Sequence, residues 1–169
     1  SRAIKLLEMT AVSSRDDVIR SYQVALTLKG DRDRGAALFK QNCSVCHQVG
    51  SVGYQVGPNL ATMKNRGAEA ILTNVLDPNR EVAPNYMEYT VTTTDGRVFT
   101  GLIASETATS ITLRSAENKE QTVLRSEIEE ITDSRKSLMP EGLEKKIPPQ
   151  EMADLLTFIL HSSPIATSS

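Results

Sequence analysis

The chain of 169 residues contains no tryptophan, and aromatic side chains make up only 4% of it. It has no excess of positive charge either, because 19 lysines and arginines are balanced by 21 aspartates and glutamates. Nucleic acid is therefore not expected as the main partner, since phosphate binding needs a basic surplus and base stacking needs aromatic platforms. No apolar run approaches the roughly 20 residues that span a bilayer, so no transmembrane segment is expected.

Cysteine is also scarce, and both cysteines fall in one short stretch. Cys43–His47 reads Cys-Ser-Val-Cys-His, which is the C-x-x-C-H pattern of covalent haem attachment. Two thiols at this spacing can add across the two vinyl groups of a haem, and the histidine that follows is then placed under the iron as an axial ligand. We predict one haem c, attached through Cys43 and Cys46 and ligated by His47.

Two other uses of a C-x-x-C pair compete with this interpretation: a redox dithiol and half of a zinc site. A zinc site would need a further pair of cysteine or histidine ligands, and the only other histidine, His161, stands far along the chain. Because haem is attached to this pattern outside the cytoplasm, we expect an exported, periplasmic protein. Ser1–Lys5 lacks the apolar core of a signal peptide, which favours a mature form or a fragment of a larger protein.

The first 30 residues are predicted to form an N-terminal helical extension. Residues 1–12 carry apolar side chains without a stop signal and are expected to end a helix of a preceding domain. Ser14 then begins a capping-box pattern with Asp17, and Gly30 is expected to end the helix that follows. This helix either packs on the core or sets the distance to an upstream domain.

Two further helices are expected to enclose the haem. One begins at Asp31 or Asp33 and leads into the first cysteine, although it contains Gly35, which costs about 1 kcal/mol relative to alanine. A close crossing with another helix would explain this glycine. The best candidate is a last helix that begins at Pro148-Pro149 and has an apolar stripe from Met152 to Leu160.

Between these helices the period of the apolar residues changes from helical to alternating. The alternation predicts an insertion at about residues 86–133, with a hairpin turn at Asp95-Gly96. We expect a mainly α core with an inserted small antiparallel β-sheet or SH3-like half-barrel. Short helices are expected at 61–65 and 67–76, and strands at 88–94, 98–104, 110–114, 121–124 and 129–132.

A six-coordinate haem needs a second axial ligand, and methionine sulfur is the main candidate. Met139 lies in an irregular stretch before the last helix, and Pro140 keeps the backbone extended there. We predict that Met139 is the ligand, with Met87 as the second choice. Met63 and Met152 occupy helical positions, where a methionine that fills a gap in the core is the simpler interpretation. His161 lies close to a polar terminus and is expected to be solvent-exposed, and Met9 is a more remote candidate.

Several short patterns together resemble class I c-type cytochromes. In chain order they are Gly35 with Leu38-Phe39, Cys43–His47, Gly57-Pro58 with Leu60, and Leu138-Met139-Pro140 before the closing helix. The resemblance covers residues 31–83 and 134–161. It implies that the first and last helices cross near Gly35 and Phe158. It also implies that the Pro58 carbonyl accepts a hydrogen bond from the ring of His47 and thereby fixes this ligand.

Longer stretches resemble the haem-binding domain found in planctomycetes and verrucomicrobia, and this likeness covers nearly the whole chain. The stretches are 57–66, 77–82, 95–97 and 137–143. In that family the domain closes large exported proteins, often behind a dehydrogenase-type propeller or helical repeats. The resemblance implies a cytochrome c domain at residues 31–169 and a fused upstream dehydrogenase domain or a separate redox partner protein.

We therefore expect a monohaem c-type cytochrome module, and not an enzyme, that carries single electrons between a dehydrogenase-type donor and another carrier. Ligation by His47 and Met139 leaves no open position on the iron. The alternative is a haem sensor or peroxidase-like domain whose sixth position is open or weakly ligated. For the insertion two roles stay open: a module that binds partners, or a lid that lowers solvent access to the haem.

Overall fold

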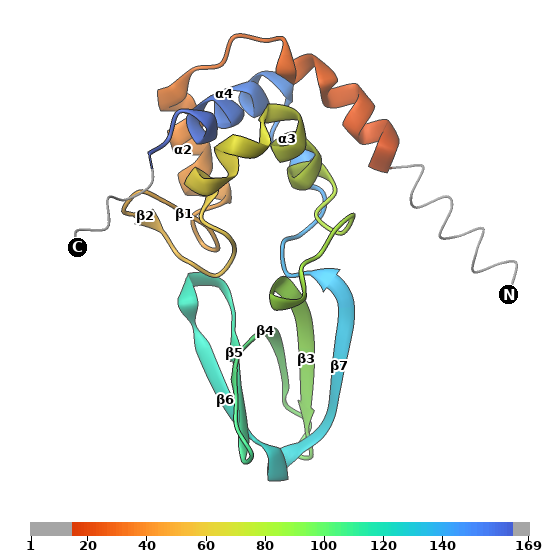
Figure 1. Cartoon of the computed structure of the whole chain (residues 1–169). Coiled ribbons are helices and arrows are strands. Elements are labelled where there is room, and N and C mark those ends of the chain that lie inside the picture. The colour runs from red at the N-terminus through yellow and green to blue at the C-terminus, as the bar shows by residue number, and fades with distance from the viewer. Residues whose placement is uncertain (1–14, 164–169) are drawn as a thin grey trace, which may run out of the picture.

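The computed structural model describes residues 15–163. Figure 1 shows a helical half and a separate half made of strands, with loops that pass between them. The predictions for residues 1–12 and for the cap at Ser14 lie outside the described residues.

The helical half is built from elements at both ends of the chain. Residues 15–22 are helical and run into a short 3-10 turn. The elements that follow are η1 (Gln23–Leu26), α2 (Arg32–Asn42), η2 (Leu60–Arg66), α3 (Ala68–Leu76), η6 (Leu143–Lys145) and α4 (Pro149–Leu160). Their shared core includes the fully buried side chains of Phe39, Leu72, Leu76, Ile147, Met152, Leu155 and Ile159.

Helices α2 and α4 cross closely at Gly35, as the glycine in α2 predicts. A Cβ on Gly35 would lie 2.0 Å from the carbonyl oxygen of Asp154 and 2.8 Å from the Cβ of Phe158. One helical turn later, the rings of Phe39 and Phe158 pack with their centroids 5.4 Å apart. The expected crossing near Gly35 and Phe158 is confirmed.

A buried carboxylate joins the start of α2 to α4. Asp31 caps α2 by accepting a hydrogen bond from the backbone N–H of Arg34 at 2.8 Å, so of the two expected caps Asp31 is the one used. Asp154, only 1% exposed, accepts hydrogen bonds from the backbone N–H of Asp31 at 2.7 Å and from Nε of Arg34 at 2.8 Å. The hydrogen bond from Arg34 is the largest influence on Asp154 and lowers the pKa of this carboxyl group.

The predicted role of Gly30 as a helix stop is wrong. The helical region ends earlier, at Leu26, with Thr27 as its C-cap. Gly30 instead lies against α4, where a Cβ would be 2.0 Å from Oγ1 of Thr157 and 2.3 Å from the carbonyl oxygen of Ala153. A glycine that permits close approach and a glycine that ends a helix look alike in sequence, which explains the error.

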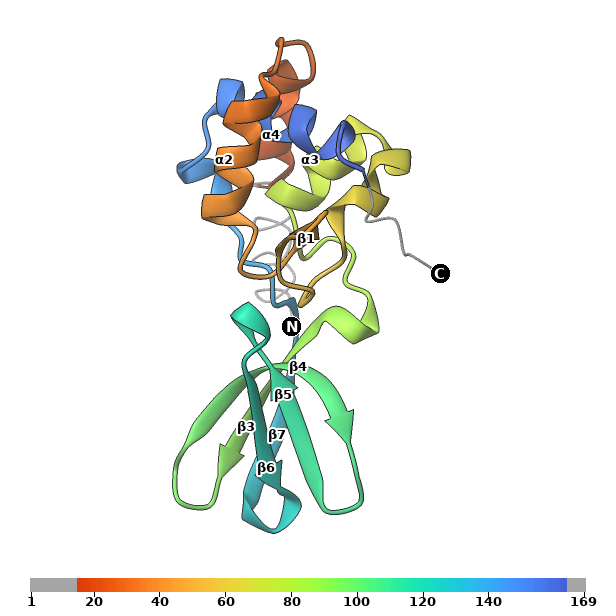
Figure 2. The ribbon, with the colours of Figure 1, turned by 90° about the vertical axis from the view of Figure 1, so that its left-hand side faces the viewer.

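The other half of the molecule is a five-stranded antiparallel sheet with its own small core. Its strands are β3 (Met87–Thr93), β4 (Val98–Glu106), β5 (Ser110–Arg114), β6 (Glu120–Leu124) and β7 (Ile128–Ser137), in the order β6-β5-β4-β3-β7. Figure 2 shows how their hairpins extend away from the helices. The core of the sheet consists of the buried side chains of Val91, Ile111, Leu113 and Val123.

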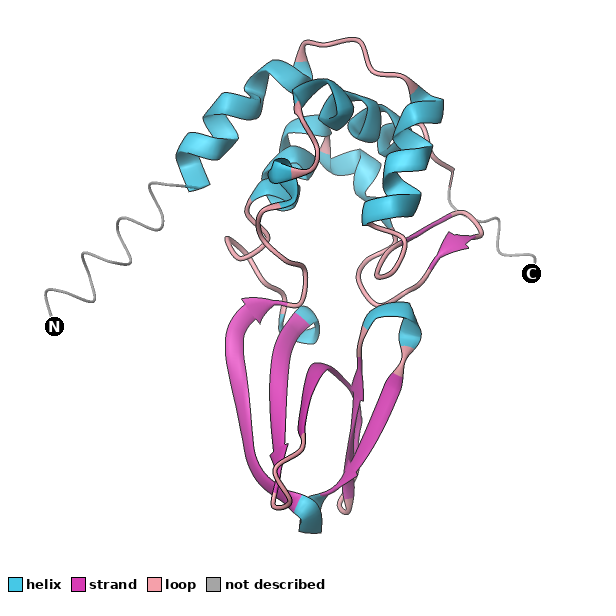
Figure 3. Ribbon diagram, turned by 180° about the vertical axis from the view of Figure 1, so that it is seen from behind, coloured by secondary structure: helices cyan, strands magenta, loops and turns pink. Residues whose placement is uncertain are grey.

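The prediction of a mainly α fold is wrong, because 42% of the structure is helical and 27% is in strands. Figure 3 shows the strands as a unit comparable in size to the helical half. The five expected strands are present, but β7 continues to Ser137 where the alternation indicated an end at Thr132. Its second half is polar and pairs with β3 across a bulge, so it carries no apolar alternation.

Replacing Gly35 by alanine should destabilise the fold by about 1–3 kcal/mol, because the added methyl group overlaps the backbone of α4. In an unobstructed helix the same change would stabilise by up to about 1 kcal/mol. The free energy of unfolding from denaturant titration tests this. Ala37→Ser at an exposed position of α2 is the control, and a Gly35→Ala variant as stable as this control would contradict the crossing.

The Asp154 carboxylate should make stability depend on pH. Its pKa in the folded protein lies below the ordinary value of 3.8, so its contribution is present above that value and is lost as the pH falls through and below it. Asp154→Asn should therefore cost about 2 kcal/mol at pH near 7 and much less in acid. Urea titrations of both proteins at neutral and acidic pH measure the difference. An equal difference at both pH values would contradict the role of this charge.

Candidate haem site

The attachment stretch Cys43–His47 continues directly from the end of α2. The backbone N–H of Cys43 donates to the carbonyl of Phe39 at 2.8 Å, which extends the helical pattern by one bond. The N–H groups of Cys46 and His47 then both donate to the carbonyl of Cys43, at 3.1 and 2.8 Å. This compact turn places the two cysteines and the histidine at the end of a helix whose position is set by its crossing with α4.

Each carbonyl group from Cys43 to Cys46 accepts a backbone hydrogen bond. Besides the turn itself, two distant segments supply the donors: the loop that follows the ribbon of β1 (Gln48–Val49) and β2 (Val52–Gly53), and the hairpin turn η4 (Ala116–Asn118) of the sheet. The pairs are Tyr54 N to Ser44 O at 3.0 Å, Glu117 N to Val45 O at 2.7 Å, Val56 N to Cys46 O at 3.0 Å and Gly57 N to Cys46 O at 2.6 Å.

The bond from Glu117 to Val45 is the contact that sequence reasoning missed. It joins the sheet to the middle of the attachment stretch. Because only backbone atoms make this bond, it does not depend on residue type and cannot be predicted from the sequence. Glu117 and Asn118 both have left-handed backbone, with φ of 61° and 55°. Such backbone costs non-glycine residues roughly 1 kcal/mol each, so this turn holds an unfavourable shape at the point where it reaches the attachment stretch.

The ring of His47 is held by a hydrogen bond of 2.7 Å between Nδ1 and the carbonyl oxygen of Pro58. A carbonyl oxygen only accepts, so Nδ1 carries the hydrogen and Nε2 is the nitrogen that can bind iron. Burial lowers the pKa of His47 below its ordinary value, although the bond to Pro58 acts in the opposite direction. Gly57 lies against the ring, since a Cβ there would be 2.5 Å from Cε1. A neutral, oriented imidazole directly after two thiols fits a haem c.

The two competing uses of the thiols find little support. Burial, with a smaller contribution from Cys46, raises the pKa of Cys43 to about 12, and burial also raises the pKa of Cys46. A redox dithiol depends on a lowered thiol pKa, so the trend runs against this chemistry. Within residues 15–163, no three side chains of the kind that bind metals gather at one place, so the thiols lack the further ligands that zinc needs.

The methionine candidates lie in distinct surroundings. Met139 lies in the irregular stretch between β7 and η6, and its partly buried side chain packs against the core of the helical half. Met152 is fully buried in that core, as expected for a gap-filling side chain. Met63 is partly buried against the same core, and Met87 is the first residue of β3. The exposed His161 makes a local hydrogen bond to Thr157, and Met9 lies outside the described residues.

A cleft of about 380 Å³ separates the loop that holds His47 from the sheet. The loop contributes Pro58, and β4 contributes the stretch Leu102 to Ala104. The sheet therefore faces the haem-site loop across a small open space. The remaining lining residues are Gln55, Val56, Gly57, Asn59, Asn85, Tyr86 and Arg114.

Comparison with known proteins agrees with this geometry. Residues 33–100 match the family model of cytochrome c. A cytochrome c-553-like protein of Synechocystis sp. is 37% identical over 68 residues, which cover 37% of this chain and 64% of the relative. The chain thus spans less than two thirds of the length of that relative. These similarities support a class I c-type cytochrome and imply covalently bound haem c, with Cys43 and Cys46 as the candidate attachment residues. The likeness to the planctomycete and verrucomicrobial domain stays a prediction.

Gly57→Ala adds only one methyl group, but it should disturb the haem site strongly. The new methyl group would lie 2.5 Å from Cε1 of His47, so the ring or the loop must move and the bond to Pro58 weakens. We expect a loss of about 2 kcal/mol in the free energy of unfolding and less haem bound per protein. Gly50→Ala is the control for bound haem, because a Cβ there meets nothing within 4 Å; alanine still costs stability at this position, since Gly50 has a φ of 58°, so the comparison uses haem content alone. Equal losses of bound haem in the two variants would contradict the contact.

Proposed function

We propose that the protein is a monohaem c-type cytochrome module that carries single electrons, with His47 and Met139 as the axial ligands. The observation that carries this proposal is the bond between Nδ1 of His47 and the carbonyl of Pro58, directly after two thiols at haem-attachment spacing. It leaves Nε2 for the iron. The haem iron, when bound, supplies the one-electron chemistry, and the chain holds and shields it without acting as an enzyme.

Each part of the site has a separate task in this proposal. Cys43 and Cys46 form the thioether bonds, and Pro58 fixes the ring of His47 and raises the basicity of this ligand. Met139 closes the sixth position, which favours a relatively high potential and excludes external ligands. Pro140 and the packing of Met139 on the helical core support this assignment, since they restrict where the thioether can point.

The sheet acts in this proposal as a cover and brace for the haem-binding loops. Two observations support it: the bond from Glu117 to the carbonyl of Val45, and the position of β4 opposite the loop that contains Pro58. On the other side, β7 ends at Ser137, two residues before Met139. The sheet is thus connected to both ligand-bearing stretches, and this favours a cover over an independent module for binding partners.

The partner in this proposal is a redox protein, either a separate carrier or a dehydrogenase-type domain of the same polypeptide. Among the helices of the described part of the chain, none has the length and apolar composition to cross a membrane. The haem attachment pattern favours an exported protein, since the thioether bonds are made outside the cytoplasm.

Met139→Ala should convert the protein from a six-coordinate carrier into one with an open iron position. We expect loss of the methionine–iron absorption band of the oxidised protein and rapid binding of carbon monoxide after reduction. Met63→Leu, at another partly buried methionine of the same core, should keep the band. If the unaltered protein binds carbon monoxide as fast as the Met139→Ala variant, a sensor or peroxidase-like function replaces the carrier.

A further inference from the structure

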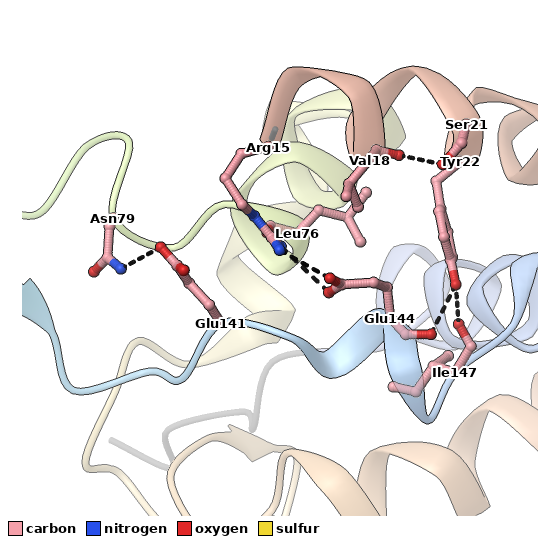
Figure 4. Close-up of polar contacts among 9 residues, drawn as sticks. All are labelled: Arg15, Val18, Ser21, Tyr22, Leu76, Asn79, Glu141, Glu144 and Ile147. Atoms are coloured by element: carbon pink, nitrogen blue, oxygen red, sulfur yellow. Dashed lines mark hydrogen bonds and ion pairs between the residues drawn. The ribbon is translucent and has the colours of Figure 1, made fainter. Parts of the chain in front are cut away.

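Asn79 uses both ends of its side-chain amide on the stretch that carries Met139. It lies just after α3, and its Oδ1 accepts a hydrogen bond of 2.8 Å from the backbone N–H of Ser137. Its Nδ2 donates to Oε1 of Glu141 at 2.6 Å, as Figure 4 shows. Ser137 and Glu141 stand two residues before and two residues after Met139. One side chain therefore holds both flanks of the predicted ligand.

We propose that Asn79 is a positioning residue for the Met139 thioether, which it holds at the iron by fixing the ends of the loop 137–141. This inference rests on the proposed function, because it requires Met139 to be the axial ligand. It adds a residue outside the ligand set whose amide determines how firmly the sixth position is closed.

Beyond the pairing of Ser137 with Met87 at the end of the β3–β7 ladder, the loop makes only weak backbone bonds to the rest of the protein, so the bonds to Asn79 become important. Pro140 has no backbone N–H to donate. The N–H of Leu138 reaches the carbonyl of Tyr86 at 3.4 Å, beyond the usual length of such a bond. The N–H of Met139 donates to Oγ of Ser137 at 3.1 Å, a bond inside the loop that does not anchor it to the rest of the protein. The two short bonds to Asn79 join the loop to the end of α3.

The turn that contains Asn79 is itself held in place by buried neighbours and by ion pairs. Leu76, the last residue of α3, is fully buried, and Pro78 is buried as well. The next residue, Arg80, donates from Nε to the carboxylate of Asp77 at 3.0 Å and also pairs with Asp16 in the N-terminal helix. This turn is therefore held from two sides, so the side-chain amide of Asn79 has a fixed position from which it can hold the loop.

A second tie connects the same two parts of the chain. Arg15 donates from Nη1 to Oε1 of Glu144 at 2.8 Å (Figure 4). It also donates from Nη2 to the carbonyl of Leu76. The side chains of Arg15 and Glu144 are only 16% and 11% exposed. Through Arg15, η6 is joined both to the N-terminal helix and to the end of α3, just beyond the loop. Asn79 and Arg15 together leave the loop little freedom to withdraw from the helical core.

An asparagine suits this task because it offers one acceptor and one donor on a short side chain. An aspartate at this position could still accept from the N–H of Ser137, but it could not donate to Glu141 and would repel its carboxylate. Asn79→Asp therefore removes one bond, adds a repulsion and changes the size of the side chain very little. The variant separates the hydrogen-bonding pattern from packing.

The test measures how firmly methionine stays on the iron in the intact haem protein. The readout is the pH at which the methionine–iron band of the oxidised spectrum disappears. For Asn79→Asp we expect the equilibrium constant between the methionine-bound and displaced forms to fall by on the order of tenfold, as for one lost hydrogen bond to a charged group together with the added carboxylate repulsion. The midpoint pH should fall accordingly. Asn65→Asp, on the exposed surface of η2, should leave it unchanged.

A compensating variant distinguishes positioning from a general loss of stability. Asn79→Asp combined with Glu141→Gln restores a donor and acceptor pair, because the new amide at position 141 can donate to the new carboxylate. We expect the midpoint pH to recover in this double variant. Glu141→Ala removes only the second bond at an exposed position; it should give a smaller fall, and it tests the idea even if the Asn79→Asp variant does not fold.

The outcomes separate this inference from the proposed function. If Met139→Ala loses the band while Asn79→Asp and Glu141→Ala both keep the midpoint of the unaltered protein, Met139 is the ligand and Asn79 does not position it. A fall in Asn79→Asp without recovery in the double variant would also overturn the inference. If Met139→Ala keeps the band, the assignment of the ligand fails, and the role of Asn79 fails with it.

Discussion

The contact between Gly35 and the carbonyl of Asp154 determines where α2 and α4 cross, and both candidate ligand loops depend on that crossing. The cysteines and His47 follow the end of α2, whereas Met139 lies shortly before the start of α4. Two stretches about 90 residues apart in the sequence are thus each joined to one helix of the same crossing, although the start of α4 packs against the start of α2 and not against its end. Asp154 reinforces the arrangement, since its buried carboxylate binds the first turn of α2.

The sequence could predict those features that require particular residue types. The C-x-x-C-H pattern, the glycine at the crossing and the Asp-Gly hairpin turn each require particular residue types. The bond from His47 to Pro58 was implied by the resemblance to class I cytochromes, and the structure contains this contact. The site assignments of Cys43, Cys46 and Met139 remain predictions, since they concern bonds to a cofactor.

What the sequence could not predict depends on backbone atoms or on partners far along the chain. The N–H of Glu117 reaches Val45 whatever its side chain is, so no residue pattern announces the contact. Asp77-Pro78-Asn79 has the composition of an ordinary turn, and the sequence does not indicate the two partners of Asn79, which lie about 60 residues further along. The polar half of β7 lacks alternation, so the sequence predicts too short a strand; the predicted fold class is wrong because it treats the five expected strands as a small insertion in a helical core. In each case the missing information is three-dimensional proximity.

The pairing of β3 with β7 has a consequence for how the inserted segment can vary. Met87 pairs with Ser137, so the chain leaves the helical half and returns to it at neighbouring positions of one ladder. For the helical half, the inserted segment from Met87 to Ser137 therefore acts like a short connection, because its two ends are held side by side. Adding residues in the middle of such a segment raises the entropic cost of closing it only slowly. The turns between β3 and β4 and between β4 and β5 are therefore free to diverge in length while Tyr86 keeps its place beside the ligand loop, whereas the turn between β5 and β6 is fixed by the bond from Glu117 to Val45.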